Sequence, residues 1–173
     1  MKHTAIYLAL AFAVGGAIPS AAQDALVAAA HASQAESTAP ASQPDLSPDA
    51  KAVVAVVEQF GIALAKADFK AVQSLLDADV LILESGGAER SRDEYMAMHA
   101  ISDAQFLNGA HSQLTQRRTR VDGDLAWVGS ESELHASKDG KPLTLLSTET
   151  MVLKRAGAEW RIVHIHWSSR PKR

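Results

Sequence analysis

Two histidines stand two residues apart near the end of the chain, in the stretch WRIVHIHWSSR. Alternate residues of a β-strand point to the same face, so His164 and His166 share a face and lie about 7 Å apart. Such a pair can share a zinc, copper, iron or nickel ion if a third ligand comes from elsewhere. The candidate third ligands are Glu84, His99 and Glu149. The alternative is that both histidines bond to backbone or carboxylates, or lie on an exposed or dimer-facing sheet.

Strict alternation along this strand decides what else the histidines would face. It predicts that they share a face with Trp160 and Ile162, and that the opposite face carries Val163, Ile165 and Trp167. If the histidine face looks into the domain, ligand or metal chemistry is favoured. If the other face looks in, the interior is apolar and the histidines belong to the outside or to a dimer.

Glu84 is the acidic residue whose position is most suggestive. It follows the apolar run VLIL and precedes Ser-Gly-Gly, so it ends a buried strand beside a turn. A partly desolvated carboxylate there would have a raised pKa and could act as a general base, with His99 or His166 as its partner. The alternative is that Glu84 caps the loop or pairs with Arg90 or Arg92.

Three further residues are candidates for contact with a ligand. Tyr95 lies four residues before His99 on a predicted helix, so the two share a face, and one of them could line a cavity with Glu84. The alternative is that the pair forms a packed, hydrogen-bonded helix face. Trp127 is predicted either to form a wall of that cavity or to pack on a partner subunit. Glu149 lies in the strand next to the histidine strand, and we expect it to face the ligand.

The elements that position these residues follow from periodicity and capping signals. Ser47 can cap a first helix, and Ser91 with Glu94 forms a capping box for a third one. Turn signals such as KDGK separate strands in the second half. The predicted order is helix 48–66, helix 69–76, strand 80–84, helix 92–101, and strands 111–121, 125–137, 142–155 and 159–170. Three helices on one face of a strongly bent antiparallel sheet make an α+β domain.

The chain begins with a basic start, an apolar run and a small-residue cleavage site, which predicts a signal peptide at 1–22. An Ala-, Ser- and Pro-rich linker is expected at 23–46, and one domain at 47–170. The protein is therefore expected to be secreted or periplasmic, with no membrane span after cleavage. There is no cysteine, and the net charge is −3, which disfavours nucleic acid as a partner.

The segment FGIALAKADFKAVQSLLDADVLIL, the hairpin strands and the ending WRIVHIHWSS resemble the nuclear transport factor 2-like superfamily, in particular its SnoaL-like bacterial branch. The ending also resembles the association domain of calcium/calmodulin-dependent kinase. The resemblance covers about 50–169 and implies a cone-shaped fold with a cavity, and often a dimer formed through the sheet. Members include ketosteroid isomerases, polyketide cyclases, dehydratases, binding domains and oligomerisation modules. Ketosteroid isomerases use a tyrosine on the first helix, which this chain lacks, so no catalytic set is carried over.

The sequence is compatible with three functions. The first is binding of a small organic ligand in the cone, with isomerase-, cyclase- or dehydratase-like proton transfer. The second is a periplasmic transition-metal protein that uses the strand histidines. The third is a dimerisation module without catalysis. The sequence does not identify a cofactor or the ligand.

Overall fold

The structure, a computed structural model, describes residues 46–138 and 140–173. The signal peptide expected at 1–22 and nearly all of the linker expected at 23–46 lie outside these residues. The described residues form one compact unit that starts at Leu46. Within that unit, no helix is long and apolar enough to cross a membrane.

The first two helices begin where the sequence predicts. In α2 (Pro48–Ala65), the Ser47 hydroxyl accepts a hydrogen bond from the Ala50 amide at 3.2 Å, and proline follows the cap. The chain then turns through Ala67, which has a positive φ of 55°. Asp68 starts α3 (Phe69–Leu75) by accepting from the Ala71 amide at 3.1 Å. Each helix therefore starts at a side chain that satisfies a free backbone amide of its first turn.

The predicted third helix is in fact two helices. The Ser91 hydroxyl caps α4 (Arg92–Met98) by accepting from the Glu94 amide at 3.1 Å. The chain breaks at His99, and α5 (Ala100–Asn108) follows. The expected end at residue 101 is therefore wrong, because Ala100 and Ala104 are buried and give α5 a packed face that small residues do not signal.

Six strands form one sheet in the order β2-β1-β6-β5-β4-β3. The last four make the predicted antiparallel meander. The first strand, however, pairs in parallel with the last, so the sheet is mixed rather than wholly antiparallel. The strand bounds are β1 (Leu76–Glu84), β2 (Gly87–Glu89), β3 (His111–Asp122), β4 (Leu125–Lys138), β5 (Lys141–Ala156) and β6 (Glu159–Pro171).

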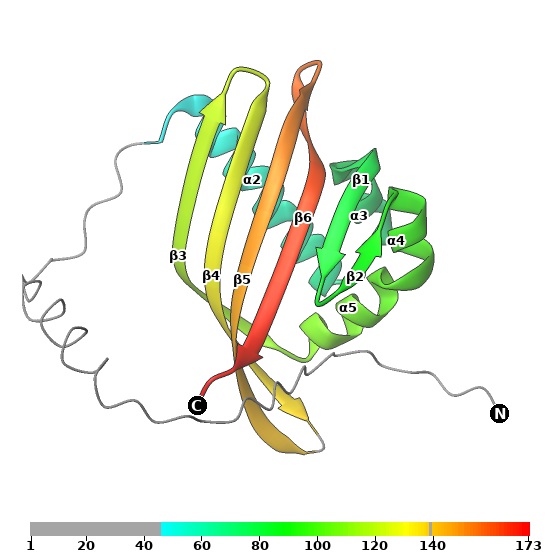
Figure 1. The fold of residues 1–173 in the computed structure, drawn as a ribbon, viewed down its shortest axis with the longest axis vertical. Coiled ribbons are helices and arrows are strands. Elements are labelled where there is room, and N and C mark those ends of the chain that lie inside the picture. Colours follow the sequence, from blue (N-terminus) through cyan, green and yellow to red (C-terminus); the bar gives the residue numbers. More distant parts are fainter. Residues whose placement is uncertain (1–45, 139) are drawn as a thin grey trace, which may run out of the picture. The chain divides into compact units, whose positions relative to one another are not determined.

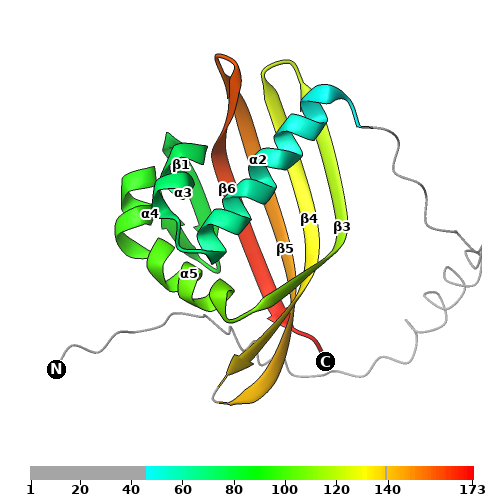
Figure 2. The same ribbon diagram turned by 180° about the vertical axis from the view of Figure 1, so that it is seen from behind.

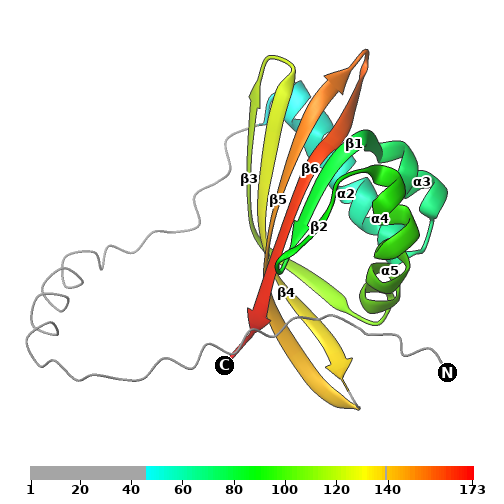
Figure 3. The same cartoon turned by 45° about the vertical axis from the view of Figure 1, so that its right-hand side comes forward.

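The four helices of the described residues cover one face of the sheet, which confirms the α+β class (Figure 1). Figure 2 shows α2 crossing the sheet obliquely, with α3, α4 and α5 gathered on the side of β1. Seen from the side, helices and sheet form two layers (Figure 3). The core lies between them and includes Val53, Val57, Phe60, Leu64, Val80, Ile82, Tyr95, Val128, Met151, Leu153, Ile162 and Ile165. We call the helix-covered face of the sheet the inner face and the opposite one the outer face.

Strand β6 does not alternate strictly. Its pairing with β5 shifts between Val152 and Leu153, whose partners are His164 and Ile162, so Val163 is an extra residue in a bulge. Ile162 and Ile165 are therefore both fully buried, although they are three residues apart. The predicted grouping of Ile162 with the histidines is wrong. After the bulge, Trp167 packs against the core on the inner face, and the histidines turn outward.

Candidate functional site

Glu84 ends β1 on the inner face, directly beside Trp167 of β6. The tight turn that follows has positive φ at Ser85 and Gly86 and leads the chain back into β2. Burial raises the pKa of Glu84 from 4.5 to about 7, with further increases from Asp103 and Glu89 and a partial offset from His99. The raised pKa confirms the expectation for a desolvated strand end. The pairing of Glu84 with Arg90 or Arg92 is not formed.

The helices place a tyrosine–aspartate pair next to Glu84. Tyr95 of α4 is completely buried, and its hydroxyl donates a hydrogen bond to Asp103 of α5 at 3.0 Å. Burial, with the Asp103 charge, raises the pKa of Tyr95. Burial also raises the pKa of Asp103, against the lowering effects of the Tyr95 hydrogen bond and of His99. Asp103 therefore holds its proton to a higher pH than an exposed aspartate does.

A histidine–glutamate pair completes this group. Glu89 of β2 is only 4% exposed, and its carboxylate contacts Nδ1 of His99, which stands at the break between α4 and α5. That hydrogen bond raises the pKa of His99 above its usual value. We call Glu84, Glu89, Tyr95, His99 and Asp103 the carboxyl cluster. It contains groups that can accept and donate protons near neutral pH.

The carboxyl cluster continues into a line of polar residues across the inner face. Register pairs run from Glu84 to Trp167, from Trp167 to Glu149, from Glu149 to Ser130, and from Ser130 to Arg117. We call these five residues the polar row. At its far end, Arg117 donates to Ser130 at 3.2 Å and to Glu58 of α2 at 2.7 Å. The polar row therefore connects the sheet to α5 at its Glu84 end and to α2 at its Arg117 end.

Glu149 is the second carboxylate of the row, and its surroundings resemble those of Glu84 only in part. Burial raises the pKa of Glu149, while hydrogen bonds and the Arg117 charge oppose that effect. The Trp167 indole N–H donates to its carboxylate at 2.8 Å. Glu149 is thus held by direct partners, whereas the Glu84 carboxylate makes no side-chain hydrogen bond within the part of the chain that the structure describes.

The two strand histidines lie on the outer face, away from the carboxyl cluster. His164 Nδ1 is 2.8 Å from the Leu81 carbonyl oxygen, and His166 is exposed opposite Leu83. Glu84 and Glu149 are on the inner face, so the structure does not bring them together with the histidines. Over residues 46–138 and 140–173, no group of three or more His, Asp or Glu residues is placed to hold a metal ion. The predicted pairing of Glu84 with His166 is wrong, because the two side chains lie on opposite faces of the sheet.

Trp127 also lies on the outer face, with 40% of its surface exposed. Its ring covers Gly129, where an added Cβ would come within 3.3 Å of the indole. The buried neighbours Ala126 and Val128 take the inward positions of β4. Trp127 is therefore not a wall of the inner-face site, and Trp167 occupies that place instead.

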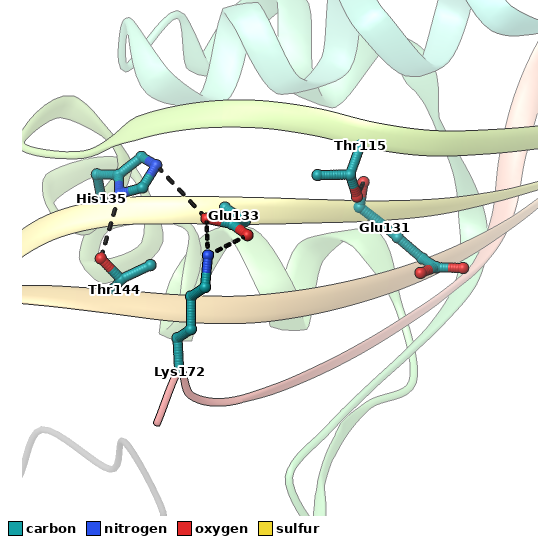
Figure 4. A network of polar contacts seen from close by, with 6 residues as sticks. All are labelled: Thr115, Glu131, Glu133, His135, Thr144 and Lys172. Carbon is teal, nitrogen blue, oxygen red and sulfur yellow. Dashed lines mark hydrogen bonds and ion pairs between the residues drawn. The ribbon is translucent and has the colours of Figure 1, made fainter. Parts of the chain in front are cut away.

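A separate polar network lies toward the β4–β5 hairpin (Figure 4). The Lys172 ammonium donates to both oxygens of Glu133 at 2.6 and 2.8 Å, and His135 pairs with Thr144 at 3.2 Å. These contacts tie the end of the chain to β4. Nearby is a hollow of about 290 Å³, lined by Glu131, Glu133, Leu146, Arg170 and the hydroxyl side chains of Thr115, Ser132, Ser147, Thr148, Ser168 and Ser169.

The sequence identified part of this site and missed the rest. Glu84, Tyr95 and His99 do meet, and Glu149 lies in the adjoining row. Asp103 was missed because it lies beyond the predicted end of its helix, and Glu89 because its strand is only three residues long. Alternation grouped Trp167 with Ile165 but left open which face looks in, and the bulge at Val163, which brings Ile162 to the same face, cannot be read from apolar periodicity.

Comparisons with known proteins agree with this architecture. A model of the SnoaL-like domain matches residues 53–171. A candidate ketosteroid isomerase from Shewanella frigidimarina NCIMB 400 is 35% identical, with a TM-score of 0.65, covering 68% of this chain and 94% of that one. The CaMKII hub of S. rosetta is 23% identical, with a TM-score of 0.64, covering 72% and 99%. A candidate dehydratase of the NTF2-like family from Streptomyces avermitilis is 22% identical, with a TM-score of 0.61, covering 70% and 97%.

No curated protein matches the chain. The family model spans most of the described domain, and the structural neighbours share its arrangement of helices on a curved sheet. This chain belongs to the SnoaL-like domain family and has the NTF2-like fold.

Proposed function

We propose that this domain binds a small organic molecule against the inner face of its sheet and transfers a proton on it, with Glu84 as the general base. The observation that carries the proposal is the Glu84 carboxyl, whose pKa of about 7 suits both removal and return of a proton near neutral pH. The name of the Shewanella frigidimarina neighbour, a candidate ketosteroid isomerase, agrees with this chemistry.

Each member of the carboxyl cluster has a role in this reaction. The Glu84 carboxylate removes a proton from a carbon next to a carbonyl, and the electron pair moves onto the carbonyl oxygen. The protonated Asp103 carboxyl, which accepts a hydrogen bond from Tyr95, donates a hydrogen bond to that oxygen, where negative charge develops. Glu84 then returns the proton to the same carbon or to another one. His99, held by Glu89, lowers the pKa of Glu84 and so limits how far burial raises it.

The surroundings of Glu84 also indicate the class of ligand. The rings of Phe60 and Tyr95 each lie 6.3 Å from the Trp167 ring, so the site has an aromatic wall. The carboxylates of Glu84 and Glu89 disfavour an anion by charge repulsion. We therefore expect a neutral, mainly apolar ketone rather than a carboxylate or a phosphate ester.

Exchange of carbon-bound hydrogen in heavy water tests the proposal whatever the product of the reaction is. Cyclic and β,γ-unsaturated ketones are incubated with the protein in D₂O, and deuterium next to the carbonyl is measured by NMR. Wild-type protein should accelerate exchange on at least one ketone, and Glu84→Gln should abolish the acceleration. Glu131→Gln, an exposed glutamate of β4, is the matched control and should keep wild-type rates. Equal exchange in wild type and Glu84→Gln, or none with any ketone, would overturn the proposal.

Self-association is a second candidate function, favoured by the outer face. Leu81, His164, Val152 and Trp127 are consecutive register partners across four strands, and Leu81 and Trp127 are 38% and 40% exposed. We infer that this row pairs with the same row of a second copy in a homodimer. Light scattering should give a dimer for wild type and a monomer for Trp127→Glu. Ile62→Glu, at a more exposed apolar position on α2, should remain dimeric. A monomeric wild type, or a dimeric Trp127→Glu, would contradict the inference.

Export is the remaining part of the proposal, and it rests on the sequence at 1–22. We infer that the chain is cleaved near Ala22 and secreted or released into a periplasm. Expression of the full chain in a Gram-negative host, followed by fractionation and intact mass measurement, tests this. A full-length product retained in the cytoplasm would refute export.

A further inference from the structure

Trp167 stands between the two carboxylates of the polar row. It is the register partner of Glu84 on one side and of Glu149 on the other, and all three side chains are on the inner face. Neighbouring strands are about 4.8 Å apart, so the backbone positions of the two glutamates flank that of Trp167, and the indole reaches the Glu149 carboxylate. It is also the largest apolar side chain beside Glu84 in the sheet. The ring is therefore placed where it can shield Glu84 from water.

Two kinds of contact hold the ring. The Phe60 ring stacks on it at 25° and the Tyr95 ring is tilted at 49°, both with centroids 6.3 Å away. Such aromatic contacts are favourable over a range of offsets and leave the ring some freedom. The directional restraint is the hydrogen bond from the indole N–H to Glu149, at 2.8 Å. A bond to a carboxylate is among the stronger hydrogen bonds in proteins.

We propose that Glu149 is a positioning residue for the proton-transfer site: by anchoring the Trp167 indole, it keeps water away from the Glu84 carboxyl. This inference rests on the proposed function only for its consequence in catalysis. The structural link from Glu149 through Trp167 to Glu84 can be tested separately.

Glu149 is built into the sheet in a way that suits an anchor. Besides Trp167, the Glu149 carboxylate has Ser130 as a hydrogen-bond partner and is stabilised by the positive charge of Arg117. Arg117 in turn donates a hydrogen bond to Glu58 of α2. The carboxylate therefore has partners on three strands, β3, β4 and β6, and α2 fixes one of these partners. It is also far enough from Glu84 that the charges acting on Glu84 are those of Asp103, Glu89 and His99. A loss of the Glu149 charge should by itself have little effect on Glu84.

Burial is the largest cause of the high pKa of Glu84, ahead of any charge. A tryptophan that is free to swing would admit water and weaken that cause, as desolvation is sensitive to local packing. The pKa of Glu84 is thus a reporter for the position of Trp167. Tyr95, which contacts the indole together with Phe60 and Glu149, remains in place through its hydrogen bond to Asp103.

The test compares two substitutions of the same residue. Glu149→Gln keeps an oxygen that can accept the indole N–H, whereas Glu149→Leu has a similar size and no acceptor. Protein with ¹³C-labelled glutamate is titrated by NMR, and the Glu84 carboxyl signal is assigned from Glu84→Gln. We expect the Glu84 pKa to stay near its wild-type value in Glu149→Gln. In Glu149→Leu it should fall by about one unit or more toward 4.5, with a changed Trp167 indole N–H shift.

Trp167→Phe tests the same link from the other side and guards against misfolding of Glu149→Leu. It keeps an aromatic ring and the partners Ser130 and Arg117 of Glu149, but it has no N–H to donate. It should also lower the Glu84 pKa. Adding Glu149→Leu to Trp167→Phe should not lower the Glu84 pKa further, because the link from Glu149 through Trp167 to Glu84 is already broken.

The outcomes separate this inference from the proposed function. A Glu84 pKa that is unchanged in both Glu149→Leu and Trp167→Phe overturns the inference. So does an equal fall in Glu149→Gln and Glu149→Leu, since the effect would then be one of charge. If the Glu84 pKa follows Glu149 as expected but no ketone exchanges deuterium, the inference stands and the proposed function fails.

Discussion

Replacing Glu84 by glutamine should stabilise the protein at alkaline pH and leave its stability unchanged in acid. The substitution removes the charge and keeps the shape. The Glu84 carboxylate has no hydrogen-bond partner among the described side chains, so glutamine loses no contact that the structure contains. The folded protein holds the Glu84 proton more tightly than the unfolded chain does, because burial raises the pKa from 4.5 to about 7.

The sign of the effect follows from this order of pKa values. Below 4.5 the carboxyl is protonated in both states, and Glu84 adds no pH dependence. Between 4.5 and about 7 the unfolded chain loses its proton first, so the wild-type free energy of unfolding falls as the pH rises. Above that window the full cost of the buried charge remains. Glutamine has no such cost.

The magnitude follows from the same two values. Each pH unit between them corresponds to ~1.4 kcal/mol, so the unscreened difference is roughly 3 kcal/mol. Glu84 is only partly buried, and solvent screening reduces that figure. We expect Glu84→Gln to raise the free energy of unfolding by ~2 kcal/mol at about pH 8 and by less than ~0.5 kcal/mol at about pH 4.

Urea unfolding followed by tryptophan fluorescence at the two pH values measures this difference. Glu131→Gln is the control, since Glu131 is exposed on another part of the sheet, and its difference between the two pH values should be near zero. An equal effect of Glu84→Gln at both pH values would show that burial does not perturb Glu84. A variant less stable than wild type at the higher pH would show that its charge is stabilised by an unseen partner.

Three further predictions test the local structure. Tyr95→Phe removes the hydrogen bond to the partly buried Asp103 and should lower the free energy of unfolding by ~1–2 kcal/mol in urea; no change would mean that the bond does not form. Ser91→Ala removes the cap of α4 and should cost ~1 kcal/mol in thermal unfolding, with recovery in Ser91→Asp. Ile165→Ala should cost ~2–5 kcal/mol, and its neighbour His166→Ala less than ~0.5 kcal/mol, by chemical denaturation. Similar costs for the last two would contradict the assignment of inner and outer faces in β6.

The sequence determined the elements whose signals are local. Ser47 and Ser91 mark helix starts by the hydrogen bonds that a hydroxyl can make with free amides, and the structure forms both caps. Turn residues such as Gly123 and Gly157 separate the strands of the meander, because they adopt a positive φ at little cost. The family resemblance added the arrangement of these elements, which short-range patterns alone do not specify.

Only the tertiary structure decided how the site is assembled. The bulge at Val163, the parallel pairing of β1 with β6 and the break at His99 depend on packing between segments far apart in the chain. Together they turn the histidines outward and bring Trp167, Asp103 and Glu89 to Glu84. A carboxyl pKa depends on burial and on the charges around it, so the sequence could name Glu84, but only the folded chain supplies the environment that raises its pKa to about 7.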